Sequence, residues 1–247
     1  MAFRILTIIP ARAGSKGLRG KNIRKIAGKP LLTHAIELAQ KSQRKGENWS
    51  IVVSTDSRKY AQIARKAGAT IPELRPKNLA QDTTRLTEVV FHTLDLMESH
   101  QSQFDCVMLI TPSTPLTIPA DLRRGIRQFK KEKLVSLASV TEIQRPPSWV
   151  FSIKNGRLQQ EDLGRVEQRQ SQAPTYQLNG ALYLANPTWL RTNGQFVRRG
   201  ETQPLLMPKS RAIDIENADD LSHAKYLFAG RSTPANSVQF DLSSGYD

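Results

Sequence analysis

Short strand-like runs alternate with segments of helical period along the first 140 residues, and this alternation limits the possible folds more than any other feature. The runs occupy residues 5–9, 51–54, 106–110 and 135–140. Apolar residues recur at helical spacing within 31–39, 60–67, 90–97 and 122–129. Strands joined by helical crossovers pair in parallel. The pattern therefore predicts an α/β fold, with a mainly parallel sheet flanked by helices.

Cap residues and later apolar runs predict the remaining elements. Asp56 is the expected N-cap of the second helix, which should end at Gly68. Further short strands are expected at 181–185, 205–207 and 212–215, followed by a closing helix at 219–227 that Gly230 caps. Residues 1–230 should form one domain, and 231–247, which show little periodicity, a flexible tail.

The alternation stops between Thr141 and Gln177, in a stretch rich in Gln, Arg and Pro. Only a short strand at 150–153 and a turn at Asn155-Gly156 are indicated there. We interpret residues 141–177 as an inserted arm. Its apolar residues need a partner surface: Trp149, Val150, Phe151 and Ile153.

The charge is strongly positive, with 36 Lys and Arg against 22 Asp and Glu and a formal net charge of +14. Eight cations precede the first acidic residue, Glu37, so an anionic partner is expected near the N-terminus. Aromatic residues make up 6% of the chain and do not alternate with basic ones, which argues against the stacking platforms of nucleic-acid-binding modules.

Other features bear on location and redox chemistry. No apolar run approaches the roughly 20 residues of a membrane span, and residues 1–10 do not resemble a signal peptide, so we expect a cytoplasmic protein with no membrane partner. The single cysteine, Cys106, lies within an apolar run. It is expected to be a buried strand thiol rather than a nucleophile.

The loop after the first expected strand carries the clearest chemical pattern, PARAGSKGLRGKN at 10–22. Glycines allow the backbone to approach a triphosphate, Ser15 and backbone N–H groups can donate to phosphate oxygens, and the cations can neutralise developing charge. Gly14 and Gly20 enclose five residues where a P-loop needs four, and Asn22 stands where a P-loop has Ser or Thr. The loop therefore predicts a phosphate-handling site of another kind.

This loop resembles the N-terminal signature of the acylneuraminate cytidylyltransferases, the CMP-sialic acid or CMP-nonulosonate synthetase family. Further matching motifs, which span residues 4–228 in the family's order, are 28–32 (GKPLL), 54–56 (STD), 74–76 (LRP), 79–82 (LAQD), 112–116 (PSTPL), 179–183 (NGALY) and 213–215 (IDI). The resemblance implies a Rossmann-like sheet and transfer of CMP from CTP to an acidic nine-carbon sugar, with release of pyrophosphate. It also implies a homodimer in which the arm of one subunit reaches the site of the other.

The resemblance assigns the nucleotide side of the site. Arg12 and Lys16 would hold the β- and γ-phosphates, and Lys21 with Asn22 would bind at the α-phosphate and ribose. Arg75 would read the cytosine. The implied nucleotide-binding residues are Ala11, Arg12, Ser15, Lys16, Lys21, Asn22, Arg75 and Thr84, and the implied catalytic residues are Lys21, Arg12 and Asp214.

On the acceptor side, the resemblance implies that Asn179, Thr111 and, from the partner's arm, Arg169 bind the sugar, and that Asp214 and Glu216 bind Mg²⁺. Simpler structural roles stay open, as a turn residue for Asn179 and as a solvated carboxylate for Asp214. The sequence departs from the family's pattern at four positions, which carry Thr111, Thr117, Ser148 and Glu216 in place of Gln, Arg, Lys and Asp.

These departures leave the identity of the sugar open and keep three alternatives. One is a cytidylyltransferase for the eight-carbon acid Kdo, although Pro112–Pro115 lacks the Gly-Asp-Glu-Pro pattern expected there, or another sugar nucleotidyltransferase. The second is a basic nucleic-acid-binding protein, and the third an inactive family member.

Overall fold

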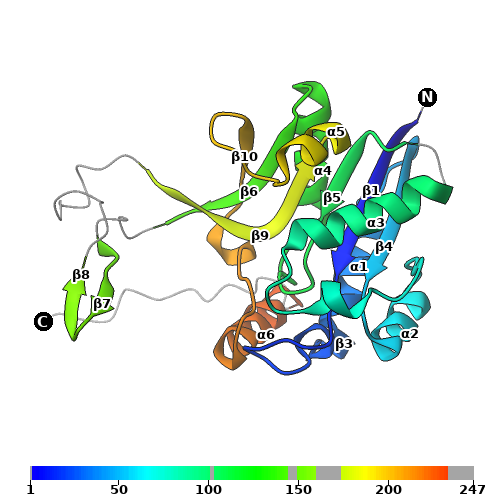
Figure 1. Cartoon of the computed structure of the whole chain (residues 1–247). Coiled ribbons are helices and arrows are strands. Elements are labelled where there is room, and N and C mark those ends of the chain that lie inside the picture. Colours follow the sequence, from blue (N-terminus) through cyan, green and yellow to red (C-terminus); the bar gives the residue numbers. More distant parts are fainter. Residues whose placement is uncertain (1, 101–102, 144–148, 160–173, 233–247) are drawn as a thin grey trace, which may run out of the picture.

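The computed structural model describes residues 2–100, 103–143, 149–159 and 174–232. Its centre is a six-stranded sheet in the order β10-β6-β9-β5-β1-β4 (Figure 1). The strands are β1 (Phe3–Pro10), β4 (Glu47–Ser54), β5 (Cys106–Leu109), β6 (Ser136–Glu142), β9 (Tyr176–Ala185) and β10 (Thr202–Leu206). β9 runs antiparallel to β5 and β6, while the other pairs are parallel. The predicted mainly parallel α/β sheet is confirmed.

Helices cover both faces of the sheet because its central strands are apolar on both sides. In β1, Ile5 and Ile9 face a core shared with α1 (Leu31–Ser42), α2 (Arg58–Lys66) and α4 (Pro119–Lys131). Leu6 and Ile8 face the opposite core, with α3 (Leu86–His100) and α5 (Pro187–Asn193). Cys106 is buried, and burial raises the pKa of its thiol, which confirms the expected core thiol.

A smaller third cluster joins an N-terminal and a C-terminal segment beside the loop at residues 10–22, called the phosphate loop below. It packs Ile26 and Leu31 against Ile215, Leu221 and Ala224. The contributing elements are the short strand β2 (Lys25–Ile26), which pairs with β3 (Lys29–Pro30), and the helix α6 (Ala218–Ser232). Figure 1 shows β1 running towards β3 and α6, so this cluster lies near the end of β1 where the predicted loop begins.

Three local predictions were wrong. The N-cap of α2 is Ser57, whose hydroxyl accepts from the Tyr60 N–H at 3.4 Å, because Asp56 is turned towards the phosphate loop. Residues 212–215 form no strand: Ala212 N donates to Lys209 O at 3.1 Å in a local turn, and Ile215 N donates to Ser113 O at 2.9 Å, which gives no ladder of strand hydrogen bonds. Gly230 lies inside α6, because its φ is not positive as a glycine cap requires.

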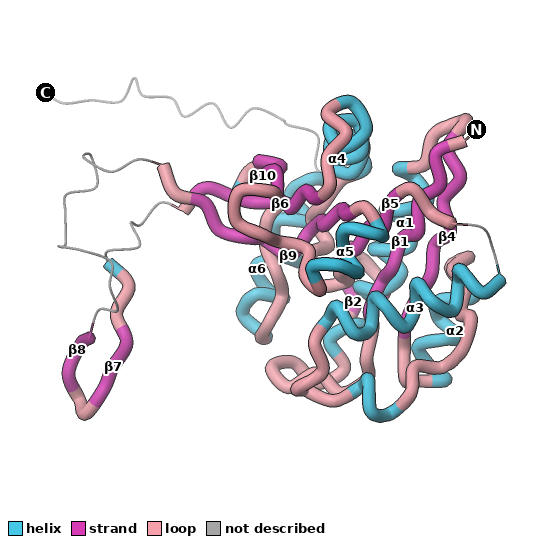
Figure 2. Tube along the Cα trace, turned by 45° about the horizontal axis from the view of Figure 1, so that its top comes forward, coloured by secondary structure: helices cyan, strands magenta, loops and turns pink. Residues whose placement is uncertain are grey.

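The described part of the arm contains a hairpin of β7 (Ser152–Lys154) and β8 (Arg157–Gln159). Asn155 and Gly156 turn it with φ values of 53° and 72°, as a two-residue hairpin turn of type I′ requires, which confirms the expected turn. The strand begins at Ser152, two residues later than predicted. Figures 1 and 2 show the hairpin well away from the sheet, and Val150 and Ile153 are 62% and 75% exposed.

The structure describes only the first part of the predicted C-terminal tail. Residues 233–247, most of the predicted tail, lie outside the described residues, and Arg231 and Ser232 complete α6. Among the helices described, none combines the length and apolar character needed to cross a bilayer.

Candidate active site

A cavity of about 360 Å³ opens at the C-terminal ends of β1 and β5. Open α/β sheets bind ligands at this edge. Most of the predicted site residues line the cavity, namely Arg12, Ser15, Lys16, Lys21, Asn22, Arg75, Thr84, Thr111 and Glu216. Ala11 is fully buried beside the cavity and does not line it. The structure therefore brings most of the predicted site residues together around one cavity.

Backbone and side-chain hydrogen bonds hold the phosphate loop against the end of β4. Ala11 N donates to Ser54 O at 2.9 Å, and Ala13 N donates to the Asp56 carboxylate at 2.9 Å. Within the loop, the buried Asn22 amide donates to Arg12 O at 3.0 Å. Asn22 thus closes the loop structurally, beside any role it has towards a ligand. The anchoring role of Asp56 was missed, since nothing local in the sequence distinguishes it from a helix cap.

Gly17 brings the loop directly against the C-terminal segment. A Cβ at Gly17 would lie 2.4 Å from the Glu216 carbonyl oxygen, so no side chain fits there, whereas a Cβ at Gly14 would meet open space. Next to this contact, Lys21 Nζ lies 2.9 Å from Glu216 Oε1, and the Lys21 side chain is only 15% exposed. The loop glycines thus differ, and Gly17 is the one that close packing demands.

One carboxylate, Asp82, holds two of the predicted phosphate ligands. Its oxygens lie 2.5 Å from Arg12 Nη2 and 2.9 Å from Lys16 Nζ. Hydrogen bonds from Lys16 and then Arg12 lower the pKa of Asp82, so the carboxylate is ionised and paired. The sequence placed Asp82 in a family motif but indicated no role, because Arg12 and Asp82 are far apart in the chain.

Arg75 is buried, at 6% exposure, and still lines the cavity. It donates from Nε to Ser54 Oγ at 3.0 Å and from Nη2 to Ser54 O at 2.6 Å. Burial lowers its pKa to about 10, partly opposed by the Asp56 carboxylate, so the group stays charged at neutral pH. Nearby, the Thr84 hydroxyl donates to Asn78 O at 3.1 Å, which folds the adjoining loop over the cavity.

The acceptor-side predictions are brought together around Gly180. Asn179 is 4% exposed, and its Oδ1 accepts from Ser139 Oγ at 2.5 Å and from Ala181 N at 3.1 Å. Its Nδ2 has no partner among the described residues. Thr111 Oγ1 donates to Gly180 O at 3.1 Å. Asn179 does not line the cavity itself, and Arg169 and Ser148 lie outside the described residues.

Asp214 and Glu216 flank this region. Asp214 is exposed, yet partial desolvation by the surrounding protein raises the pKa of its carboxyl. A hydrogen bond with Ser113 lowers this pKa, and the charge of Glu216 raises it. Gly180, with a φ of 71°, leaves room for Asp214, because a Cβ there would lie 2.9 Å from Oδ2. Burial and then the Asp214 charge raise the pKa of Tyr183, an acceptor-side neighbour that the sequence did not single out.

The carboxylates of Asp214 and Glu216 are suited to a magnesium ion that takes its other ligands from substrate phosphates. In the ranges that the structure describes, no three His, Cys, Asp or Glu side chains are grouped to hold a metal without help. Mg²⁺ commonly uses one or two carboxylates together with substrate phosphates. Just before this segment, Arg211 donates two hydrogen bonds of 2.9 Å to the Asp121 carboxylate of α4.

Comparison with known proteins identifies the family of the chain. The cytidylyltransferase family model matches residues 6–227. The chain is 39% identical to a CMP-N,N'-diacetyllegionaminic acid synthase of Legionella pneumophila, over 88% of this chain and 93% of the relative. It is 30% identical to a pseudaminic acid cytidylyltransferase of Campylobacter jejuni, over 90% and 95%.

Among solved structures, a CMP:2-keto-3-deoxy-manno-octonic acid synthetase complexed with CTP matches with a TM-score of 0.67. It covers 92% of this chain and 99% of its own, at 17% identity, which shows a shared fold alone. The family match and the more similar relatives confirm the resemblance read from the loop and the later motifs. The chain belongs to the cytidylyltransferase family of nucleotidyltransferase enzymes, in its CMP-nonulosonate synthetase branch.

Proposed function

We propose that this enzyme transfers CMP from CTP to a nonulosonic acid and releases pyrophosphate. One observation carries the proposal: a glycine-containing loop at the end of β1 directs Arg12, Lys16 and Lys21 into a single cavity. Three cations in one concave site suit a triphosphate.

Arg12 and Lys16 would bind the β- and γ-phosphates, which take the place of the Asp82 carboxylate. In this exchange, phosphate oxygens would replace the carboxylate oxygens of Asp82 as the anionic partners of the same two cations. The arrangement also keeps both side chains oriented before CTP arrives, and preorganised donors stabilise charge without reorganising during the reaction.

Lys21 would stabilise the α-phosphate, where charge develops during attack by the sugar hydroxyl. Its present partner, Glu216, would then join Asp214 at Mg²⁺. When bound, this ion would neutralise phosphate charge and lower the pKa of the attacking hydroxyl. Asp214→Asn should remove most Mg²⁺-dependent turnover, whereas turnover with wild-type Mg²⁺ dependence would place the metal elsewhere.

Legionaminate derivatives are the first acceptors to test, since the chain is 39% identical to a legionaminate-type synthase and 30% identical to a pseudaminic acid enzyme. Thr111, the Asn179 region and the partner's Arg169 would contact the sugar. We further propose a homodimer that buries the exposed apolar residues of the arm, and a cytoplasmic location, where the cellular CTP pool supplies the reaction.

The experiment is a pyrophosphate-release screen of CTP, ATP, GTP and UTP against legionaminate, pseudaminate, neuraminate and Kdo, with Mg²⁺. Turnover should require CTP and a nine-carbon acid. Preference for Kdo would support the eight-carbon alternative, and no turnover with any pair would support an inactive member. Sub-micromolar affinity for duplex DNA at physiological salt would revive the nucleic-acid alternative.

A further inference from the structure

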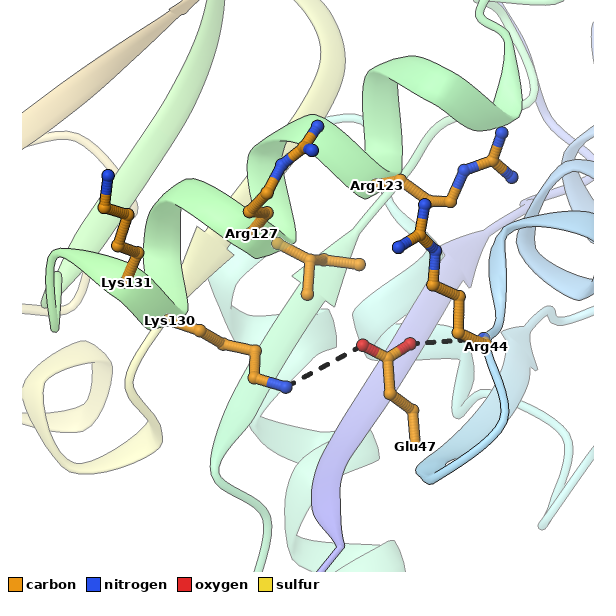
Figure 3. Close-up of a pocket in the computed structure, with 7 residues that line it drawn as sticks. Arg44, Glu47, Arg123, Arg127, Lys130 and Lys131 are labelled. Atoms are coloured by element: carbon orange, nitrogen blue, oxygen red, sulfur yellow. Dashed lines mark hydrogen bonds and ion pairs between the residues drawn. The ribbon is translucent and has the colours of Figure 1, made fainter.

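A second cationic cavity, of about 380 Å³, lies between α4 and the start of β4 (Figure 3). Its lining residues are Arg44, Glu47, Arg123, Ile126, Arg127, Lys130 and Lys131. Glu47 begins β4 and Ser54 ends it at the phosphate loop, so at ~3.3 Å per residue the two cavities are separated by roughly 23 Å along this strand. They share no lining residue.

The cavity carries five cations and one carboxylate. That carboxylate, Glu47, already accepts hydrogen bonds from Trp49 Nε1 at 3.1 Å and from Arg44 N at 3.3 Å. Of the cations, Lys130 lies nearest, at 3.9 Å, and it also lies 4.7 Å from the centre of the Phe3 ring. No carboxylate of a described residue forms an ion pair with the side chains of Arg44, Arg123, Arg127 or Lys131.

Four of the cations come from α4, and Arg44 comes from the segment before β4. Arg123, Arg127 and Lys131 repeat every four residues along α4 and therefore share one face of the helix. Figure 3 shows Arg123 and Arg127 extending from α4, with Arg44 rising beside them from the segment before β4. Arg123 Nη1 donates to Lys41 O at 3.1 Å, which fixes the direction of its guanidinium. Like charges at this spacing destabilise a helix, so a multivalent anion between them would relieve a repulsion.

We propose that this cavity binds a small anion with two or more phosphate groups, such as pyrophosphate or the triphosphate of a nucleotide. Arginine guanidinium groups bind phosphate through paired, planar hydrogen bonds. The cavity is close in volume to the candidate active site at the end of β1, called the catalytic cavity below, and cavities of this size bind small molecules. Ile126 and the aliphatic parts of the cationic side chains add an apolar wall. A surface that binds only the phosphate backbone of a nucleic acid has no need of such a wall.

The test is calorimetric titration of the whole chain with pyrophosphate, and separately with CTP, at physiological salt and without sugar. Wild-type protein should bind pyrophosphate at two sites per chain. Arg123→Ala/Arg127→Ala should weaken one site by about tenfold or more, the effect of losing charge-assisted hydrogen bonds. Arg127→Glu, which leaves the Arg123–Lys41 bond intact, should do the same. The CTP titration separates a nucleotide site from one that takes only pyrophosphate.

A matched control is Arg65→Ala/Lys66→Ala, which removes two exposed cations from α2. It should keep both sites. Equal weakening in this control, or unchanged binding in both cavity variants, would overturn the proposal, as would preference for a duplex oligonucleotide over pyrophosphate. Lys16→Ala/Lys21→Ala distinguishes the two proposals. This variant should lose pyrophosphate binding at the cavity at the end of β1, which tests the proposed function, and should keep pyrophosphate binding at the α4 cavity.

Discussion

The two cationic cavities lie at opposite ends of β4 and differ in how their cations are paired. In the catalytic cavity, Asp82 pairs with Arg12 and Lys16, and Glu216 pairs with Lys21. In the α4 cavity, Lys130 is the only lining residue of the described chain whose side-chain cation comes within 4 Å of a carboxylate. Both are basic cavities of similar volume, but the α4 cavity has a single lining carboxylate, Glu47, and no lining glycine.

This difference suits the function proposed for the cavity at the end of β1. Carboxylate partners orient Arg12, Lys16 and Lys21 before a ligand binds, so that little ordering would remain for the proposed reaction. Cations without a carboxylate partner attract anions mainly by charge, and salt screens this attraction over ~8–10 Å. The catalytic cavity should therefore be more sensitive to small geometric changes than the α4 cavity, where loss of positive charge should matter most.

The largest effect should come from Lys21. Lys21→Ala should lower kcat by roughly 10² to 10³, the loss seen when one preorganised charge-stabilising group is removed. Steady-state kinetics would measure this. Lys25→Ala is the control, because Lys25 is exposed in the same region and does not line the cavity. An unchanged kcat in Lys21→Ala would remove this residue from the mechanism.

The second effect tests geometry at constant charge. In Gly17→Ala the new Cβ would lie 2.4 Å from Glu216 O, so the loop has to move. A shift of ~1 Å can cost about 10²-fold, and we expect a loss of that order in kcat/KM for CTP. Gly14→Ala meets nothing within 4 Å and should behave like wild type. Equal kinetics of the two variants would show that loop placement does not limit catalysis.

A smaller effect is expected from Asp82. Asp82→Asn removes the charge that competes with phosphate for Arg12 and Lys16. The KM for CTP should fall about two- to fivefold, the scale of an exposed ion pair, and kcat should change little. Kinetics at low and high salt would separate these effects. A higher KM would mean that orientation of the two cations by Asp82 outweighs its competition with phosphate.

The smallest effect should come from the α4 cavity. Arg123→Ala/Arg127→Ala should change the initial rate by less than about twofold, since neither residue lines the catalytic cavity and surface changes are mostly of this size. Initial-rate assays in the absence of added pyrophosphate would measure it. A large fall in rate without loss of thermal stability would show that the cavities are coupled.

Local sequence patterns predicted most of the helices and strands, and the loop at 10–22, because each depends on residues close together in the chain. They failed where a distant contact competed. Asp56 is of a residue type that often caps helices, but its carboxylate accepts a hydrogen bond from Ala13 N–H instead. Residues 212–215 have the apolar character of a strand, but they pack Ile215 under α6.

The sequence by itself determined the α/β class, the end of the sheet where phosphate would bind and the cations that face it, since hydrophobic period and loop composition are local properties. Only the tertiary structure decided that antiparallel β9 lies between β5 and β6, that Asp82 holds Arg12 and Lys16, and that α4 and β4 enclose a second basic cavity. These features join residues far apart in the chain. Their pairing depends on how the whole core packs, which no local pattern encodes.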